Sequence, residues 1–143
     1  MIVRSDQISA LETGPDRDFH RRAFRYVQLR YPGFLDALGE EPLRQMVTQG
    51  IARGRTHGLT WESALVRFLE LMFSLAPNFD ELPAIRSKLC DESLPPEGRL
   101  NVVIEKTGYE EWQAVCWNYD PMAWGVDPVL APEVLHLRGE ARL

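Results

Sequence analysis

The chain has 143 residues, of which 45% are hydrophobic and 26% are charged. This length and composition fit one globular domain and exclude wholesale disorder. The net charge of −5 argues against nucleic acid as a partner, because phosphate binding depends on clustered Lys and Arg.

No apolar run approaches the roughly 18 residues that a membrane span requires, so we expect no span. Residues 1–16 lack the uninterrupted apolar stretch of a secretory signal, and we therefore expect a cytoplasmic protein. The charge is unevenly distributed: residues 1–57 carry a net charge of +2, whereas residues 58–143 carry −7. Such an asymmetry can orient a partner.

Helices separated by Pro and Gly are predicted for the first part of the chain. A short helix is expected over residues 6–12, and a second helix over residues 16–31, where a Pro-Gly pair stops it. A short connecting segment over residues 34–39 then leads to a third helix over residues 41–57, whose first turn accommodates a proline.

Two glycines, Gly50 and Gly54, lie four residues apart inside the third predicted helix. Each costs about 1 kcal/mol relative to Ala in a helix interior, so their presence needs a structural reason. We expect another helix to approach closely here, because glycine leaves the space that a side chain would fill.

Residues 61–76 are predicted to form a helix that is apolar around most of its circumference. Thr60 is a suitable N-cap, and Pro77 ends the helix. The apolar positions are Leu65, Phe68, Leu69, Met72, Phe73, Leu75 and Ala76. A helix with so little polar surface must be covered by neighbours on several sides, so we expect it to be the central helix of a bundle.

Shorter helices are expected in the second half of the chain. One covers residues 82–90, and another begins after Pro96. Gly108 either ends that helix or lies within a helix that continues to Trp117, and the sequence leaves both alternatives open.

Residues 118–143 are interrupted by Pro and Gly, yet they are too apolar for an ordinary disordered tail. They either fold back on the bundle or bury their apolar residues in a partner, and a brief helix over residues 132–137 fits both alternatives. The sequence therefore predicts an all-α fold. Residues 1–117 would form a compact bundle of about five to six helices around the central helix, and residues 118–143 an irregular extension.

No catalytic, metal-binding or cofactor-binding pattern is found in the sequence. The scattered candidates are His20, His57, His136, Cys90 and Cys116. The histidines lack metal-ligand spacing, and we expect the two cysteines to be buried free thiols. Asp80 and Glu81 lack a calcium-loop pattern, and we expect Asn78 or Asp80 to form turn and cap hydrogen bonds.

The stretches HGLTWESALVRFLELMFSLAPNFDELP at residues 57–83 and SLPPEGRL at residues 93–100 carry a resemblance to a known group of proteins. They resemble a widespread group of small helical bacterial proteins, in which a Tyr/His-Gly-Leu-Thr opening precedes an apolar helix and a Pro-x-Phe-Asp turn. This group is typically encoded in type VI secretion loci beside VgrG spike, PAAR and toxin genes. The matching positions are His57, Gly58, Leu59, Thr60, Phe68, Leu69, Leu71, Met72, Phe73, Pro77, Phe79, Asp80, Leu94, Pro95, Arg99 and Leu100.

The resemblance implies an accessory protein of toxin delivery that is not an enzyme. Such an adaptor or co-chaperone would bind a secreted toxin effector, or its PAAR-containing carrier, in the cytoplasm before loading. Our candidate anchors for this partner are Met122, Trp124 and Leu130, because transient apolar contacts allow later release. Arg21 and Arg25 are the candidate steering charges.

Two alternatives remain from the sequence. A cognate immunity protein would occlude the active site of a toxin, and the acidic second half of the chain would suit a basic nuclease. The third class is an enzyme or a small-molecule binder.

Overall fold

The structure is a computed structural model, and it describes residues 14–138. These residues form helices and connecting segments, without a strand in the described range: α2 (Gly14–Arg30), α3 (Pro32–Leu38), α4 (Glu40–Thr56), α5 (Glu62–Ser74), η1 (Phe79–Glu81), α6 (Pro83–Leu89), α7 (Pro96–Lys106), α8 (Tyr109–Trp117), η2 (Pro121–Trp124) and η3 (Pro132–His136). The all-α prediction is confirmed. The helix expected over residues 6–12 lies outside the described residues.

The expectation of a connecting segment at residues 34–39 is wrong, because α3 occupies most of these residues. Pro32 stands in the first turn of α3, where its fixed φ favours the helix. Phe34 is buried, and its ring lies 5.0 Å from that of Phe73 on α5. Gly39 then ends the helix with a φ of 84°, a conformation that glycine adopts readily.

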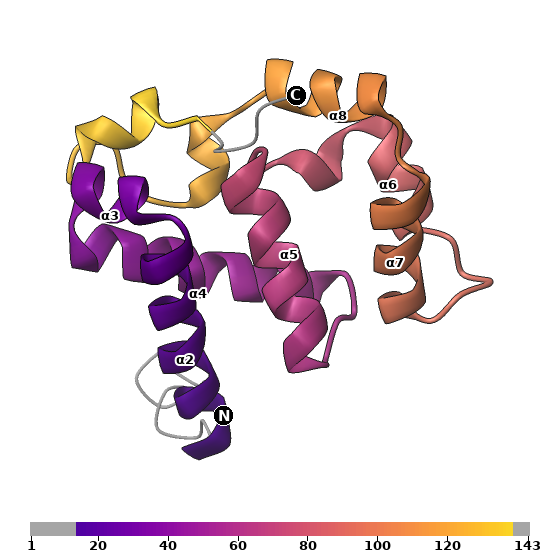
Figure 1. Ribbon diagram of the computed structural model, residues 1–143, viewed down its shortest axis with the longest axis horizontal. Helices are drawn as coiled ribbons and strands as arrows, with labels where there is room; N and C mark the ends of the chain where they lie inside the picture. Colours follow the sequence, from indigo (N-terminus) through magenta and orange to yellow (C-terminus); the bar gives the residue numbers. More distant parts are fainter. Residues whose placement is uncertain (1–13, 139–143) are drawn as a thin grey trace, which may run out of the picture.

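Helices α4 and α5 cross at close range, as the two glycines predict (Figure 1). A Cβ placed on Gly50 would lie 2.5 Å from Cδ2 of Leu69, and one on Gly54 would lie 2.9 Å from Cδ2 of Leu65. Both contacts are shorter than van der Waals packing allows. The glycines therefore let α5 pack directly on the backbone of α4.

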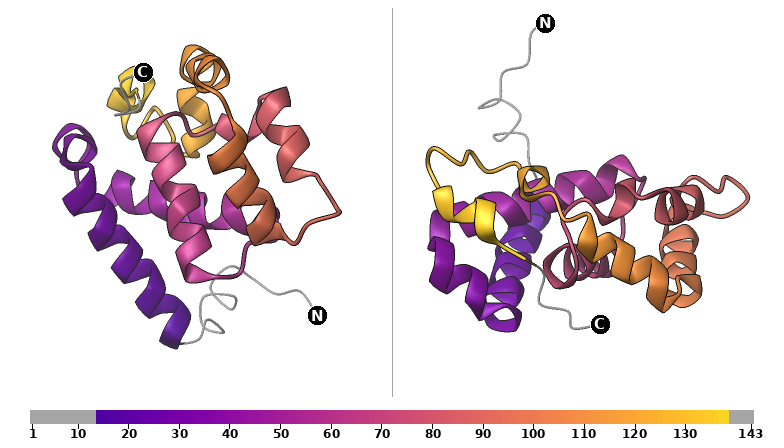
Figure 2. Two further views of the ribbon diagram at one scale, coloured as in Figure 1. Left: turned by 45° about the vertical axis from the view of Figure 1, so that its right-hand side comes forward. Right: turned by 90° about the horizontal axis from the view of Figure 1, so that it is seen from above.

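Six residues of α5 are buried: Ala64, Leu65, Phe68, Leu69, Met72 and Phe73. The helix contacts α4 on one side and α7 on another, and Figure 2 shows it between α2 and α7. The expected N-cap is wrong, because Trp61 holds that position. The backbone N and the Oγ1 of Thr60 instead donate to Oε1 of Glu97 on α7, at 3.2 and 3.3 Å.

The structure has two helices around Gly108, and not one helix that continues to Trp117. Helix α7 ends at Lys106, and Gly108 is the N-cap of α8, which ends at Trp117. No helix in residues 14–138 is long and apolar enough to cross a membrane.

The described part of the C-terminal extension lies against the bundle beside α3 (Figure 1). Five of its side chains are buried in the same core as α5: Tyr119, Trp124, Val126, Ala131 and Val134. The ring of Trp124 lies 5.8 Å from Phe34 and 4.7 Å from Phe73. Residues 119–137 thus fold on their own chain in this structure.

We expect Gly50→Leu to lower the free energy of unfolding by about 1–3 kcal/mol more than Ala52→Leu, which changes the exposed face of the same helix. The new side chain must displace Leu69 and the Sδ of Met72, which a Cβ would approach to 3.2 Å. The gain in helix propensity, about 1 kcal/mol, offsets part of this overpacking. Equilibrium urea unfolding measures the free energy of unfolding of both variants. Equal values for Gly50→Leu and Ala52→Leu would contradict the close crossing of α4 and α5.

Candidate functional site

The three predicted anchors of the C-terminal extension differ in exposure. Met122 and Leu130 are exposed, and both remain candidates. Trp124 is completely buried, so its prediction as a partner contact is wrong for this conformation. Its ring packs on Phe34 and Phe73, and its Nε1 donates to the hydroxyl of Tyr119 at 2.7 Å. Trp124 therefore positions the extension instead of contacting solvent.

The predicted steering charges lie on a different element. Arg21 and Arg25 are exposed on α2, and Arg21 forms an ion pair with Asp18 on the same helix. Figures 1 and 2 show α2 extending away from the C-terminal extension. The structure does not bring the two groups of predicted residues together at one site.

A turn before η3 presents two large apolar side chains to solvent. Val129 is 86% exposed and Leu130 is 78% exposed. The turn is fixed by Asp127, whose carboxylate accepts from the backbone N of Val129 at 2.9 Å and whose carbonyl accepts from those of Leu130 and Ala131, both at 3.0 Å. We call residues 127–131 the Asp127 turn. Asp followed by Pro is a turn signature, and it could have drawn attention to Val129, which the sequence prediction missed.

A second apolar surface lies between α6 and α8. This α6–α8 groove has a volume of about 410 Å³ and is lined by Leu82, Pro83, Ala84, Ile85, Glu110, Glu111, Ala114 and Asn118. Nearly all of the exposed surface of the groove is apolar. The two glutamates therefore contribute their methylene groups to the wall, and the carboxylate of Glu111 pairs with Lys88 on α6.

Trp117 extends this apolar surface at the end of α8. It is 82% exposed and lies three residues after Ala114 and seven after Glu110, a spacing that places all three on one face of the helix. The sequence prediction missed Trp117. It left open which helix follows Gly108, so it did not predict whether Trp117 faces the core or solvent.

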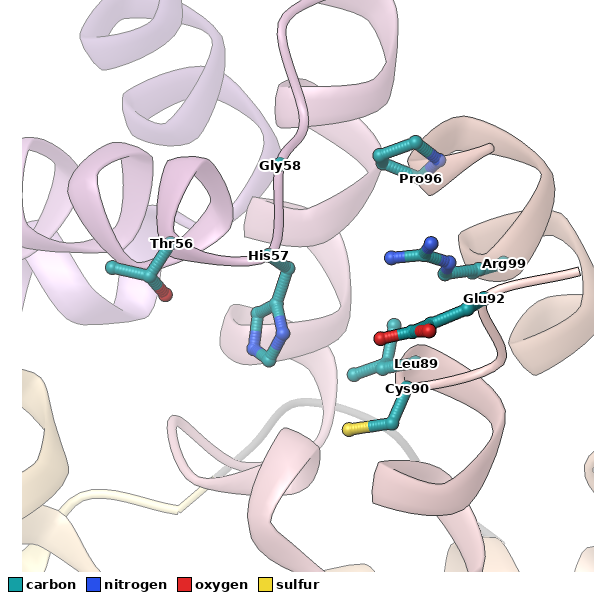
Figure 3. A pocket seen from close by; sticks show the side chains of 8 residues that line it. All are labelled: Thr56, His57, Gly58, Leu89, Cys90, Glu92, Pro96 and Arg99. Atoms are coloured by element: carbon teal, nitrogen blue, oxygen red, sulfur yellow. The ribbon is translucent and has the colours of Figure 1, made fainter. Parts of the chain in front are cut away.

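A pocket of about 560 Å³, with polar and apolar walls, lies where α4, α6 and α7 approach each other. Figure 3 shows the side chains of Glu92 and Arg99 extending from one side of the pocket toward His57 on the other, with Cys90 at its edge. The expectation of two buried thiols is wrong for Cys90, which is exposed, while Cys116 is partly buried. Nε2 of His57 is hydrogen-bonded to Asp80, so the imidazole is oriented by a carboxylate.

Asp80 joins the end of α4 to the turn after α5. Its side chain is 5% exposed, and it accepts from Nε of Arg53 at 2.9 and 3.0 Å, from the terminal nitrogen of Arg53 at 2.8 Å and from Nε2 of His57 at 2.8 Å. Burial raises the pKa of the Asp80 carboxyl, but the hydrogen bonds and charges of His57 and Arg53 outweigh burial and hold the pKa below its ordinary value. The expected role of Asp80 in local turn bonds is therefore wrong.

Asn78 connects the same turn to the C-terminal extension. Its side-chain amide donates to the carbonyl of Asn118 at 2.8 Å, and its oxygen accepts from the backbone N of Asp120 at 3.0 Å. The residues after α8 are thus held by the turn that follows α5. Rigid placement of an exposed apolar turn suits binding, because less conformational entropy is lost when a partner docks.

Searches of protein-family models, curated proteins and solved structures give no match to this chain.

Proposed function

We propose that the protein is a protein-binding adaptor that contacts its partner through the Asp127 turn and Met122. The observation that carries this proposal is the exposure of Val129 and Leu130 on a turn that hydrogen bonds hold in one conformation. Burial of an exposed Val or Leu in a partner is worth about 1.5–3 kcal/mol. Two such side chains on a rigid support provide a compact anchor for a protein surface.

The resemblance of residues 57–100 to small proteins of type VI secretion loci supports a particular class of partner. We propose a toxin effector, or its PAAR-containing carrier, that binds in the cytoplasm before it is loaded for secretion. Arg21 and Arg25 would then attract an acidic region of this partner, and their substitution would lower the association rate of the complex.

A co-purification experiment tests the adaptor proposal. We expect Leu130→Asp to weaken capture of the PAAR-containing protein or toxin encoded in the same locus by at least about tenfold, because a buried carboxylate would replace an apolar anchor. Leu29→Asp is the matched control, since Leu29 is 71% exposed on α2, and it should bind as the unmodified chain does. Equal binding by Leu130→Asp and the unmodified chain would contradict the proposed contact surface.

Point substitution is a sharper test than deletion of residues 118–143. Deletion would also remove Trp124 from the core, so a loss of binding could follow from a loss of folding. Leu130 is exposed, and its replacement leaves the core intact. The melting temperature of the Leu130→Asp variant provides the check that its fold is retained.

A cognate immunity protein is the second candidate, and the net charge of −7 over residues 58–143 favours it. Deletion of the gene separates the two functions. If deletion causes self-intoxication that depends on the neighbouring toxin gene, the protein is an immunity protein. If deletion stops export of the toxin without killing the cell, the protein is an adaptor.

A further inference from the structure

The α6–α8 groove has a charge pattern that its apolar floor alone does not explain. Two carboxylates, those of Glu110 and Glu111, stand on its α8 side, and its lining contains neither Lys nor Arg. Glu111 pairs with Lys88 at 3.1 Å, and Lys88 also donates to the carbonyl of Ala84. Glu110 has no ion-pair partner among residues 14–138, so its charge is available to a ligand.

The groove runs between two antiparallel helices. Lys88 at the end of α6 contacts Glu111 at the start of α8, while Asn78, before α6, bonds to Asn118 after α8. The free carboxylate of Glu110 therefore lies toward one end of the groove, and Trp117 lies toward the other. Figure 1 shows α8 above α6 in the view, at the same end of the molecule.

We infer that the α6–α8 groove binds a segment of a partner protein in which one or two apolar side chains are flanked by Lys or Arg. The apolar floor takes the apolar side chains, and Glu110 pairs with the basic flank. A partner with acidic flanks would place like charges together and would be rejected. The exposed indole of Trp117 provides a flat apolar surface at the end of the groove, where it also attracts a cation over its ring.

This inference rests on the proposed protein-binding function but concerns a surface separate from the Asp127 turn. It names the chemistry of a second contact, whatever the identity of the client. Its test needs only the purified chain and synthetic peptides. Failure of the peptide test therefore leaves the co-purification result standing, and failure of co-purification leaves the peptide result standing.

The probes are two fluorescein-labelled peptides of equal length that carry leucines at helical spacing. One has Lys at the flanking positions, and the other has Glu at the same positions. We expect saturable binding of the Lys peptide in a fluorescence anisotropy titration, a shift of the Trp117 indole NMR signal, and no binding of the Glu peptide. Equal binding of both peptides, or no binding of the Lys peptide, would overturn the inference.

Substitutions in the groove locate the binding site. Glu110→Lys and Ala114→Arg should each weaken binding of the Lys peptide by about tenfold or more, because each places a cation at the rim or floor. Glu105→Lys on α7 is the matched control, since this exposed residue makes the same change in net charge outside the groove. An equal loss with Glu105→Lys would mean that the peptide responds only to overall charge, and the inference would be rejected.

Both groove residues are chosen so that the variants fold. Glu110 and Ala114 are exposed, and Glu110 forms no ion pair within the described chain. Circular dichroism and the melting temperature check each variant before the titration. If Ala114→Arg is unstable, the comparison of Glu110→Lys with Glu105→Lys decides the result alone.

Discussion

Trp124→Ala should lower the free energy of unfolding by about 3–5 kcal/mol, the cost of removing a large aromatic side chain from a packed core. The indole is completely buried and contacts Phe34 on α3 and Phe73 on α5. Its loss also removes the donor to Tyr119. Burial raises the pKa of Tyr119 to about 12, although the hydrogen bond from Trp124 opposes that shift, so near neutral pH the hydroxyl that accepts this hydrogen bond is uncharged.

Trp117→Ala is the control for this experiment. Trp117 is 82% exposed at the end of α8, and its removal should change stability by no more than about 0.5 kcal/mol. Equilibrium urea unfolding, followed by far-UV circular dichroism, measures both variants. If both variants lost the same stability, the extension would not belong to the core, and docking of residues 118–143 on a partner would be the better account.

Asp80→Ala should also lower the free energy of unfolding by about 3–5 kcal/mol. The substitution leaves the partly buried guanidinium of Arg53 and the imidazole of His57 without their shared acceptor. It also separates the end of α4 from the turn that follows α5. Asp80→Asn keeps the size of the side chain and should cost less. Asp18→Ala, which breaks exposed ion pairs on α2, should leave the urea midpoint nearly unchanged.

The contribution of Asp80 depends on pH in a defined direction. Its pKa in the folded chain lies below the ordinary value of 3.8, so its stabilising effect is present above that value and is lost as the pH falls through the lower, folded pKa. The difference in stability between the unmodified chain and Asp80→Asn should therefore be constant from pH 7 to about pH 5 and should shrink below about pH 4. A difference that grew on acidification would contradict this assignment.

Local patterns in the sequence predicted most of the helices. The Pro and Gly residues that end helices act within one or two positions, and their effect needs no knowledge of the fold. Gly50 and Gly54 were informative for a related reason. They carry a cost inside a helix that only a close neighbour explains, and α5 is that neighbour.

No comparable signal in the sequence indicated contacts between distant residues. Asp80 is 27 residues from Arg53 and 23 from His57, and a turn motif such as NFDEL predicts local bonds equally well. The short helix α3 was missed, because its stability depends on the burial of Phe34 against α5 and the extension. Local propensity alone did not indicate it.

The candidate site lies on the C-terminal extension, where the sequence also did not predict which side chains are buried. Its apolar residues do not follow a helical or strand period, so the sequence did not distinguish Trp124, which faces the core, from Leu130, which faces water. The turn chemistry of Asp127 and Pro128 was the one local feature that could have done so.

The attachment of the Asp127 turn to the core has a mechanical consequence. Trp124 and Val134 lie on either side of the turn in the chain, and both are inserted in the core that encloses α5. A partner that binds Leu130 without moving these two residues binds only the folded chain. By mass action, it would raise the melting temperature of the whole molecule. A partner that pulls the turn outward would instead have to separate the indole of Trp124 from the rings of Phe34 and Phe73, so its binding and its release would be slow and steeply dependent on temperature.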